Sequence, residues 1–229
     1  MSSFKHGKGV TIKRNNLVQL LYENLNTDCI FGTIFNFFIS VNMHLAMSES
    51  NTPSKPILLG KNYFLIGFMG TGKSHWGKLW AAAYKLTFID LDELIEQDEQ
   101  TTIAEIFEVK GEAYFRNLEK EALRKCEDLQ NTLIACGGGT PCFFENMQWM
   151  NEHGITIYIS SKPIQILDRV MEEKEKRPLL KKLNEGEILF YIEQKLKERE
   201  PFYTQAKIKV DSKSLNENSF AEIASSIHL

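Results

Sequence analysis

A glycine-rich stretch contains the residue types that bind the phosphates of a nucleoside triphosphate. Residues 67–74 read Gly-Phe-Met-Gly-Thr-Gly-Lys-Ser, which has the spacing G-x-x-x-x-G-K-[ST]. Glycines allow backbone amides to converge on phosphate oxygens, and a helix that begins here adds unpaired donors. The residues expected to bind the phosphates are Gly70, Thr71, Gly72 and Lys73. We expect the Ser74 hydroxyl to bind Mg²⁺. The motif does not indicate which reaction follows.

Position 75 comes directly after this motif and is left out of the predicted ATP-binding residues. A threonine at position 75 would have a hydroxyl that could contact ATP, but the residue there is His75. We therefore expect no ATP contact from residue 75. None of the five histidines has the H-x-x-x-H spacing of a metal site.

Two carboxylates, Asp90 and Asp92, follow the next apolar run along the chain. In an extended chain, residues two apart point to the same face. One carboxylate could then hold metal-bound water while the other takes a proton from an acceptor hydroxyl. The alternative is that Asp92 only caps a helix predicted over residues 93–97.

Several arginines are candidates for binding anions. Arg116 follows Glu112 by four residues in a predicted helix, so it could form a surface ion pair or clamp a substrate carboxylate. Arg199, in Glu-Arg-Glu-Pro-Phe-Tyr, is a second possible clamp. Arg177 lies in a long charged stretch, which is either solvated surface or a lid that delivers charge to the γ-phosphate. Residues 137–139 are three glycines at a strand end, which allow a ligand to approach the backbone or simply make a tight turn.

The elements that must position these residues alternate between apolar strands and helices. The predicted strands are 63–68, 86–89, 132–136, 155–160 and 207–210. The predicted helices are 74–84, 93–97, a capped helix from Thr102, 112–126, one after Pro163, 187–200 and 219–228. This alternation predicts a mostly parallel sheet covered on both faces. Ligands in such sheets bind beyond the carboxyl ends of the strands, where the polar residues named above fall.

Composition excludes several classes of protein. The 229 residues are 43% apolar and 25% charged, which is typical of a globular chain. A net charge of −3 argues against a large basic surface, so we expect no nucleic-acid partner. None of the four cysteines has C-x-x-C spacing, which disfavours a structural metal and favours reduced thiols in the cytoplasm.

The first part of the chain differs from the rest. Residues 1–46 carry four Lys or Arg against two acidic residues, and residues 29–47 form an uncharged run. This run could anchor the chain in a membrane, belong to a targeting segment, form an ordered accessory element, or precede a true start at Met43 or Met47. We expect residues 1–59 to be an extension that is disordered or absent from the mature protein, and residues 60–229 to be the working domain.

Taken together, six segments resemble shikimate kinases along nearly all of residues 60–211. In order they read GFMGTGKS, FIDLDELIE, IAEIFEVKGEAYFRNLE, IACGGGTP, RPLL and REPFY. The combination of D-x-D-E, G-E-x-x-F-R-x-x-E and G-G-G is far more specific than the phosphate-binding motif alone.

The resemblance implies a three-layer α/β/α fold of the P-loop kinase type, with a five-stranded parallel sheet, a substrate-binding helical region and a lid. It implies ATP-dependent phosphorylation of the 3-hydroxyl of shikimate to shikimate 3-phosphate, in the biosynthesis of chorismate and the aromatic amino acids. ATP would be the co-substrate and Mg²⁺ the cofactor. We also expect a cytoplasmic monomer, with no membrane partner unless residues 29–47 anchor the chain.

The resemblance also implies residue roles. Lys73, Asp92 and the lid arginine Arg177 would be catalytic, with Asp92 as the base and Arg177 also contacting ATP. Ser74 would bind Mg²⁺ directly and Asp90 would support it through water. The residues implied to bind shikimate are Asp92, Arg116, Gly138, Gly139 and Arg199, the two arginines through the carboxylate. Arg169 is a candidate to stack on adenine.

Three rival hypotheses remain open. A related kinase could act on gluconate or a nucleoside monophosphate, although the combination of motifs favours shikimate. A non-catalytic ATP-binding homologue would be expected to lack Lys73, Asp92 or Arg177, and all three are present. A membrane-anchored kinase depends wholly on residues 29–47.

Overall fold

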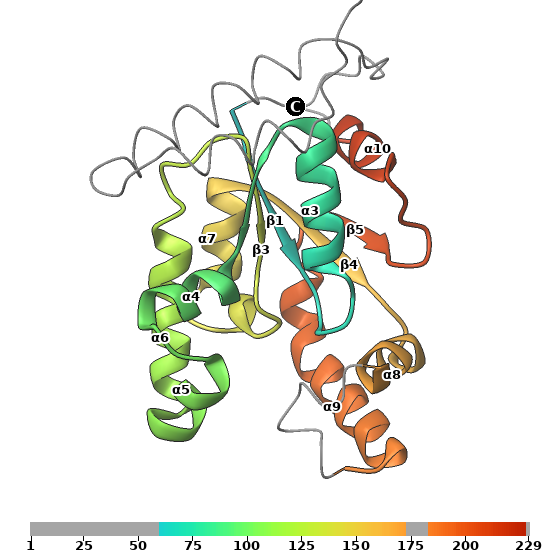
Figure 1. The fold of residues 1–229 in the computed structure, drawn as a ribbon. Helices are drawn as coiled ribbons and strands as arrows, with labels where there is room; N and C mark the ends of the chain where they lie inside the picture. The colour runs from blue at the N-terminus through green and yellow to red at the C-terminus, as the bar shows by residue number, and fades with distance from the viewer. Residues whose placement is uncertain (1–59, 173–182, 228–229) are drawn as a thin grey trace, which may run out of the picture. The chain divides into compact units, whose positions relative to one another are not determined.

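The structure, a computed structural model, describes residues 60–172 and 183–227. In this part of the chain a parallel sheet has the strand order β2-β3-β1-β4-β5 (Figure 1). Its strands are β1 (Asn62–Ile66), β2 (Thr87–Asp90), β3 (Thr132–Ala135), β4 (Gly154–Ser160) and β5 (Ile208–Asp211). This confirms the predicted five-stranded parallel sheet.

Helices cover both faces of the sheet. Two helices cover one face: α3 (Lys73–Tyr84) and α10 (Ser219–Ser225). Four cover the other face: α4 (Leu91–Glu99), α6 (Gly111–Arg124), α7 (Asn146–His153) and α9 (Glu185–Tyr203). Alternate residues of β1 supply the two cores, because Tyr63 and Leu65 face α3 while Phe64 and Ile66 face the other group. The predicted three-layer α/β/α fold is therefore confirmed.

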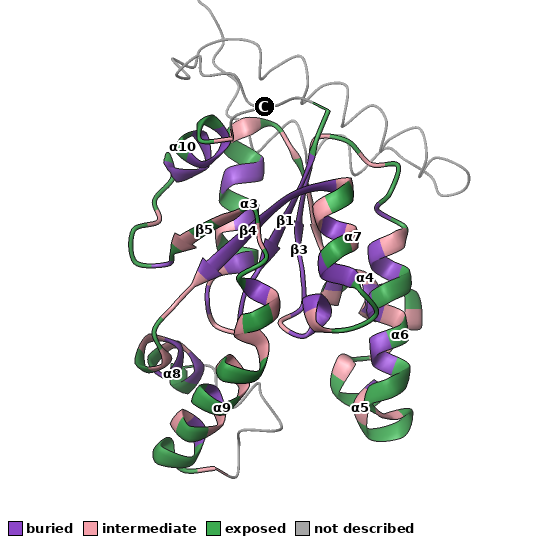
Figure 2. Ribbon diagram, turned by 180° about the vertical axis from the view of Figure 1, so that it is seen from behind, coloured by how far each residue is buried: buried purple, intermediate pink, exposed green. Residues whose placement is uncertain are grey.

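Burial follows the strand order. The central strands β1, β3 and β4 are buried along almost their whole length (Figure 2). The edge strands β2 and β5 are partly exposed. Near-continuous apolar runs are what a parallel strand covered on both faces requires.

Capping boxes determine where two of the helices begin. The side chain of Thr102 accepts a hydrogen bond from the Glu105 amide, and the Glu105 carboxylate accepts one from the Thr102 amide. This predicted capping box begins α5 (Ile103–Val109). Asn184 and Glu187 form the same arrangement at the start of α9.

A third apolar cluster joins the phosphate-binding loop to the helices that follow β4. Phe68 is fully buried against Val170 of α8 (Pro163–Glu172) and Ile188 of α9. On either side of the carboxyl ends of the strands lie α5 with the start of α6, and α8 with the start of α9 (Figure 1). The loops after the strands therefore run between two groups of helices.

Two sequence predictions differ from the structure. Helix α7 is not among the elements predicted above, because its start at Glu145 has no side-chain cap that a sequence reading could recognise. Helix α4 begins at Leu91, directly after β2, rather than at residue 93. Asp92 therefore lies in the first turn of a helix and not in an extended strand.

Some predictions fall outside the described residues. These are the extension over residues 1–59 with its uncharged run at 29–47, and the charged stretch at the proposed lid, including Arg177. Within residues 60–172 and 183–227, no helix is long and apolar enough to cross a membrane.

Candidate active site

The glycine-rich loop joins β1 to α3. Gly70 and Gly72 have left-handed backbone angles, with φ of 73° and 92°, which L side chains adopt only with strain. Lys73 is the first residue of α3, and its Nζ donates hydrogen bonds to the carbonyl oxygens of Gly67 at 2.8 Å and Phe68 at 2.9 Å. The ammonium group therefore lies across the loop, beside the amides at the helix start.

Position 75 lies in the first turn of α3, directly after the loop. The residue at this position is His75, so an assignment of threonine to position 75 is wrong. No second hydroxyl follows Ser74 directly. The His75 side chain is exposed, and its ring packs edge-on against Trp76 with the centroids 5.0 Å apart. That residue 75 makes no contact with ATP stays a prediction.

Ser74 and Asp90 bring two hard oxygen ligands together. The Ser74 hydroxyl donates to Asp90 Oδ2 at 2.5 Å, and Asp90 Oδ1 accepts from the Asp92 amide at 3.1 Å. Asp90, and not Asp92, is thus the residue that caps α4, so the capping role considered above for Asp92 is wrong. A hydroxyl and a carboxylate are the ligands that Mg²⁺ uses beside substrate phosphates. The described residues contain no group of three His, Cys, Asp or Glu side chains that could hold a metal by themselves.

The Asp92 carboxyl group lies in an unusual environment. Its Oδ1 atom is buried and has no hydrogen-bond partner among the described residues. Burial, and after it the negative charges of Asp90 and Glu119, raise the pKa of Asp92 to about 7 against the opposing positive charge of Lys73. A carboxylate with a pKa near neutrality is suited to accept a proton.

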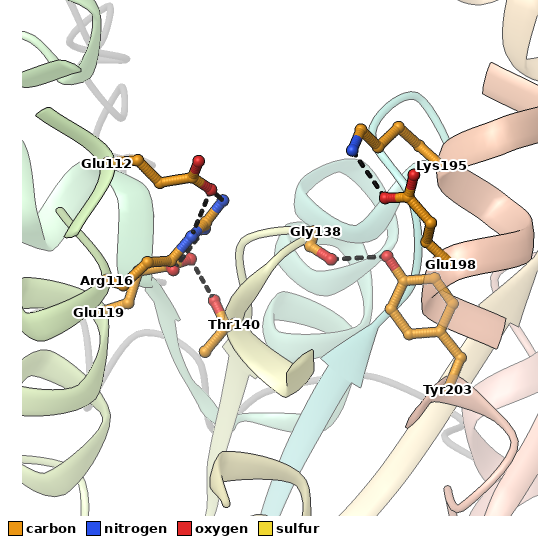
Figure 3. A network of polar contacts seen from close by, with 8 residues as sticks. All are labelled: Glu112, Arg116, Glu119, Gly138, Thr140, Lys195, Glu198 and Tyr203. Carbon is orange, nitrogen blue, oxygen red and sulfur yellow. Dashed lines mark hydrogen bonds and ion pairs between the residues drawn. The ribbon is translucent and has the colours of Figure 1, made fainter. Parts of the chain in front are cut away.

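Arg116 is held by two carboxylates of its own helix. Its Nη1 donates to Glu119 Oε2 at 2.6 Å, and its Nη2 and Nε donate to Glu112 Oε1 at 2.8 Å and 3.1 Å (Figure 3). Glu119 is 1% exposed, and its other oxygen accepts from the Thr140 hydroxyl at 2.6 Å. The predicted ion pair with Glu112 is therefore present, but it is part of a larger buried network.

The three glycines that follow β3 pack against this network and against α9. A Cβ atom on Gly137 would lie 2.6 Å from Glu119 Oε1 and 2.9 Å from Asp92 Oδ1. A Cβ atom on Gly139 would lie 2.7 Å from Arg116 Cζ, and one on Gly138 would lie 3.2 Å from Arg199 Nη1. An added side chain at any of the three positions would therefore press on Glu119, Asp92 or one of the two arginines at the point where these residues converge.

Tyr203 fixes this loop from α9. Its hydroxyl donates to the Gly138 carbonyl oxygen at 2.6 Å (Figure 3). Burial raises the pKa of Tyr203, so the phenol stays protonated and keeps donating. Arg199, one turn earlier in α9, places its guanidinium over the ring of Phe68, with Cζ 5.4 Å from the centroid. A single helix thus positions both the second arginine and the glycine loop.

Arg169 reaches the phosphate-binding loop from α8. Its Nη1 donates to the Gly70 carbonyl oxygen at 2.9 Å. The guanidinium is therefore held beside the loop expected to bind phosphates.

Comparison with known proteins identifies the family. The sequence model of the shikimate kinase family matches residues 69–228. The chain is 40% identical over 144 residues to the shikimate kinase of Phocaeicola vulgatus, covering 63% of this chain and 82% of the relative. It is 38% identical over 171 residues to the shikimate kinase of Bacteroides fragilis, covering 72% and 96%. The chain belongs to the shikimate kinase family.

Solved shikimate kinases share the fold. The crystal structure from Bacteroides thetaiotaomicron matches with a TM-score of 0.66 and 37% identity, over 72% of this chain and 93% of that one. A structure from Acinetobacter baumannii in complex with shikimate matches with a TM-score of 0.63 and 29% identity, over 76% and 93%. The chain is thus a kinase of shikimate in aromatic biosynthesis, with ATP as its co-substrate.

The described structure of this shikimate kinase brings most of the predicted site residues together. These residues are Gly70, Thr71, Gly72, Lys73, Ser74, Asp90, Asp92, Arg116, Gly138, Gly139 and Arg199. Arg177 lies outside the described residues. No role was predicted for Glu119, Thr140 or Tyr203. All three fall inside the quoted motifs, which were the available signal for them. The contacts of Glu119 with Thr140 and of Tyr203 with Gly138 join distant positions of the chain, so no motif predicts them.

Proposed function

We propose that this shikimate kinase transfers the γ-phosphoryl group of ATP to the 3-hydroxyl of shikimate, with Asp92 as the base. The observation that carries this proposal is the buried Oδ1 of Asp92, which has no partner within residues 60–172 and 183–227 and lies beside Gly137, within the electrostatic influence of Lys73. A group that accepts the hydroxyl proton must be near both the acceptor and the phosphates. The place of Asp92, beside Gly137 and within the electrostatic influence of Lys73, supports its role as that group.

In the chemical step, the 3-hydroxyl oxygen attacks the γ-phosphorus while Asp92 takes the hydroxyl proton. The bond between the γ-phosphorus and the β–γ bridging oxygen breaks, and ADP leaves with the electron pair. Such a transfer needs positioning and charge neutralisation more than covalent help from the protein.

The loop before α3 binds the phosphates of ATP in this proposal. Amides of Gly70, Thr71 and Gly72 cradle the phosphates, and Lys73 neutralises their charge. Ser74 and Asp90 would hold Mg²⁺, Asp90 through water, because their oxygens are 2.5 Å apart at the loop. Mg²⁺ would supply charge neutralisation to the phosphate oxygens when it is bound.

The roles of the two other arginines near ATP rest on different support. Arg169 lies close to the phosphate-binding loop because it is held at Gly70, whereas its stacking on adenine rests on the sequence alone. The role of Arg177 as a lid residue at the γ-phosphate rests on the sequence resemblance alone.

The carboxylate of shikimate would bind Arg116 and Arg199. Both guanidinium groups pack against the glycine loop, at Gly139 and Gly138 respectively. The backbone of these two glycines would lie beside the ring of the substrate. Arg116 presents a planar fork that suits a carboxylate, and the ion pairs with Glu112 and Glu119 fix its orientation.

We also propose that residues 60–229 are sufficient for activity, as a cytoplasmic monomer. All the residues assigned to the site lie between Gly70 and Arg199, which supports the sufficiency of residues 60–229. The cysteines of the described part, Cys126, Cys136 and Cys142, are free thiols, which suits a reducing compartment.

The proposal is tested by ADP release from Mg·ATP with shikimate, gluconate or AMP as the acceptor. Release that depends on shikimate, with phosphate found on the 3-hydroxyl of the product, is the expected result. Transfer to another hydroxyl, or equal release with gluconate or AMP, would contradict the proposed regiochemistry and binding mode.

A further inference from the structure

A strained, exposed loop follows the three glycines, between the short 3₁₀ helix η1 (Thr140–Cys142) and α7. Phe143 and Phe144 are 37% and 45% exposed, although both are large and apolar. Phe144 and Glu145 both have left-handed backbone angles, with φ of 50° and 58°. Consecutive left-handed residues other than glycine are unfavourable and tend to occur where the conformation has a function.

The loop is anchored firmly at both ends. The Cys142 amide donates to the Gly139 carbonyl at 2.9 Å, and the Asn146 amide donates to the Phe143 carbonyl at 2.9 Å. The fully buried Asn146 side chain also donates to the Thr140 carbonyl at 2.9 Å. These bonds fix the backbone around Phe143, whose side chain is partly exposed.

That place is over the guanidinium of Arg116. The ring centroid of Phe143 lies 4.5 Å from Arg116 Cζ, compared with 5.3 Å for Phe115 and 5.9 Å for Phe107. Phe115 and Phe107 also pack in the core. Phe143 is not a member of that core among the described residues, so its contact with Arg116 is separate from the packing of the core. Phe144 lies instead near Lys120, whose Nζ is 5.4 Å from its ring.

We propose that Phe143 is a positioning residue for carboxylate binding by Arg116. The aromatic face holds the guanidinium plane and excludes water from one side of it, which strengthens attraction to a carboxylate. This inference rests on the proposed role of Arg116 as a carboxylate clamp. It adds that an exposed aromatic residue, outside the motifs of the resemblance, tunes the affinity of that clamp.

The test compares Phe143→Ala with Phe144→Ala in the full chain, using steady-state kinetics at saturating Mg·ATP. We expect F143A to raise the KM for shikimate about threefold to thirtyfold, the range of a partly desolvated cation–π contact, with kcat and the KM for ATP little changed. Phe143→Tyr keeps the ring and should restore the KM. F144A is the matched control and should leave the KM unchanged.

Two further measurements separate positioning from general damage to the loop. A shikimate analogue with a hydroxymethyl group in place of the carboxylate should show the same KM with wild type and F143A. If F143A fails to fold, Phe143→Leu keeps the apolar bulk without the ring and should still raise the KM for shikimate. An unchanged KM in the folded variant, or an equal rise with F144A or with the analogue, would overturn the inference.

Arg116→Ala distinguishes failure of this inference from failure of the proposed clamp. If R116A raises the KM for shikimate and F143A does not, only the role of Phe143 is overturned. If R116A leaves the KM unchanged, the clamp is elsewhere and both proposals fail. If both proposals hold, adding F143A to R116A produces no further rise.

Discussion

Asp92 combines two conditions that a proton acceptor needs, a pKa near neutrality and a free oxygen. Asp92 lies in the first turn of α4, where burial raises its pKa and its Oδ1 has no hydrogen-bond partner among the described residues. A buried carboxylate without a hydrogen bond is costly to keep charged. Its retention here is understandable if the substrate supplies the missing hydroxyl partner.

Replacing Asp92 by Asn should test its role as the base. The amide keeps the shape of the side chain but cannot accept the hydroxyl proton, so kcat should fall about a hundredfold to ten-thousandfold. ATP affinity, measured by calorimetry, should stay close to that of the wild type. Turnover like that of the wild type would remove Asp92 from this role.

The pH dependence of catalysis should report the same group. Only deprotonated Asp92 accepts a proton, so kcat/KM for shikimate should rise with pH and level off above about 7. Below about pH 7, kcat/KM for shikimate should fall about tenfold for each pH unit. A profile that is flat between pH 5 and 8 would show that the rate does not depend on this carboxylate.

The stability of the fold should depend on pH through Asp92 as well. Its pKa rises from 3.8 to about 7 on folding, so the folded state binds more protons than the unfolded state between these values. The contribution of Asp92 to the free energy of unfolding therefore becomes less favourable to the folded state as pH rises through this window. D92N should become progressively more stable than the wild type from about pH 4 to pH 7, as measured by urea unfolding. A constant difference between the two would contradict the raised pKa.

At the scale of elements, the glycine loop after β3 is where α4, α6 and α9 meet. Asp92 of α4, Arg116 of α6, and Arg199 and Tyr203 of α9 all approach residues 137–139. Side chains from all three helices can pack against this loop because its glycines have no side chains of their own. Any displacement of α6 or α9 would be transmitted to the backbone that we propose to lie beside shikimate.

Replacing Gly139 by Ala should disturb this junction. The added Cβ would meet the guanidinium of Arg116, which is 8% exposed and held by Glu112 and Glu119, so it cannot move aside freely. We expect the KM for shikimate to rise about tenfold to a hundredfold, with a small change in the KM for ATP.

Gly186→Ala is the matched control. Gly186 lies in the first turn of α9, where an added Cβ would meet only Asn184 Oδ1 among the described residues, at an ordinary contact distance of 3.4 Å. Kinetic constants like those of the wild type are expected for this variant. Equal effects of the two substitutions would contradict the account of the junction.

At the scale of the whole molecule, the fold places two groups of helices on either side of the strand ends. One group includes α5 and α6, and the other includes α8 and α9 (Figure 1). The phosphate-binding loop lies at the end of the central strand β1, next to both β3 and β4. This is the position at which open parallel sheets bind their ligands.

A chain that begins at Met47 should retain full activity. All the residues that we assign to the site follow β1, so removing residues 1–46 should leave kcat and the KM for shikimate within about twofold of the full chain. Circular dichroism would establish that the shortened chain is folded. A folded chain with much lower activity would assign a function to the segment removed.

Local sequence was enough to determine the parts of this protein that depend on neighbouring residues. The phosphate-binding loop is contiguous, and its glycines and lysine act through the backbone of the same eight residues. The five strands and the capping box at Thr102 were likewise readable, because apolar runs and caps are local signals.

Only the tertiary structure decided how the site is held together. The bond from Tyr203 to Gly138 spans 65 residues and that from Thr140 to Glu119 spans 21, so no local pattern predicts either. The placement of Phe143 over Arg116 likewise depends on an unusual backbone between η1 and α7. Sequence spacing also misplaced Asp92 in an extended strand, because α4 begins directly at the strand end and turns its carboxylate toward the glycines. Contacts between distant segments depend on how helices pack on the sheet, and that packing arises only when the whole core forms.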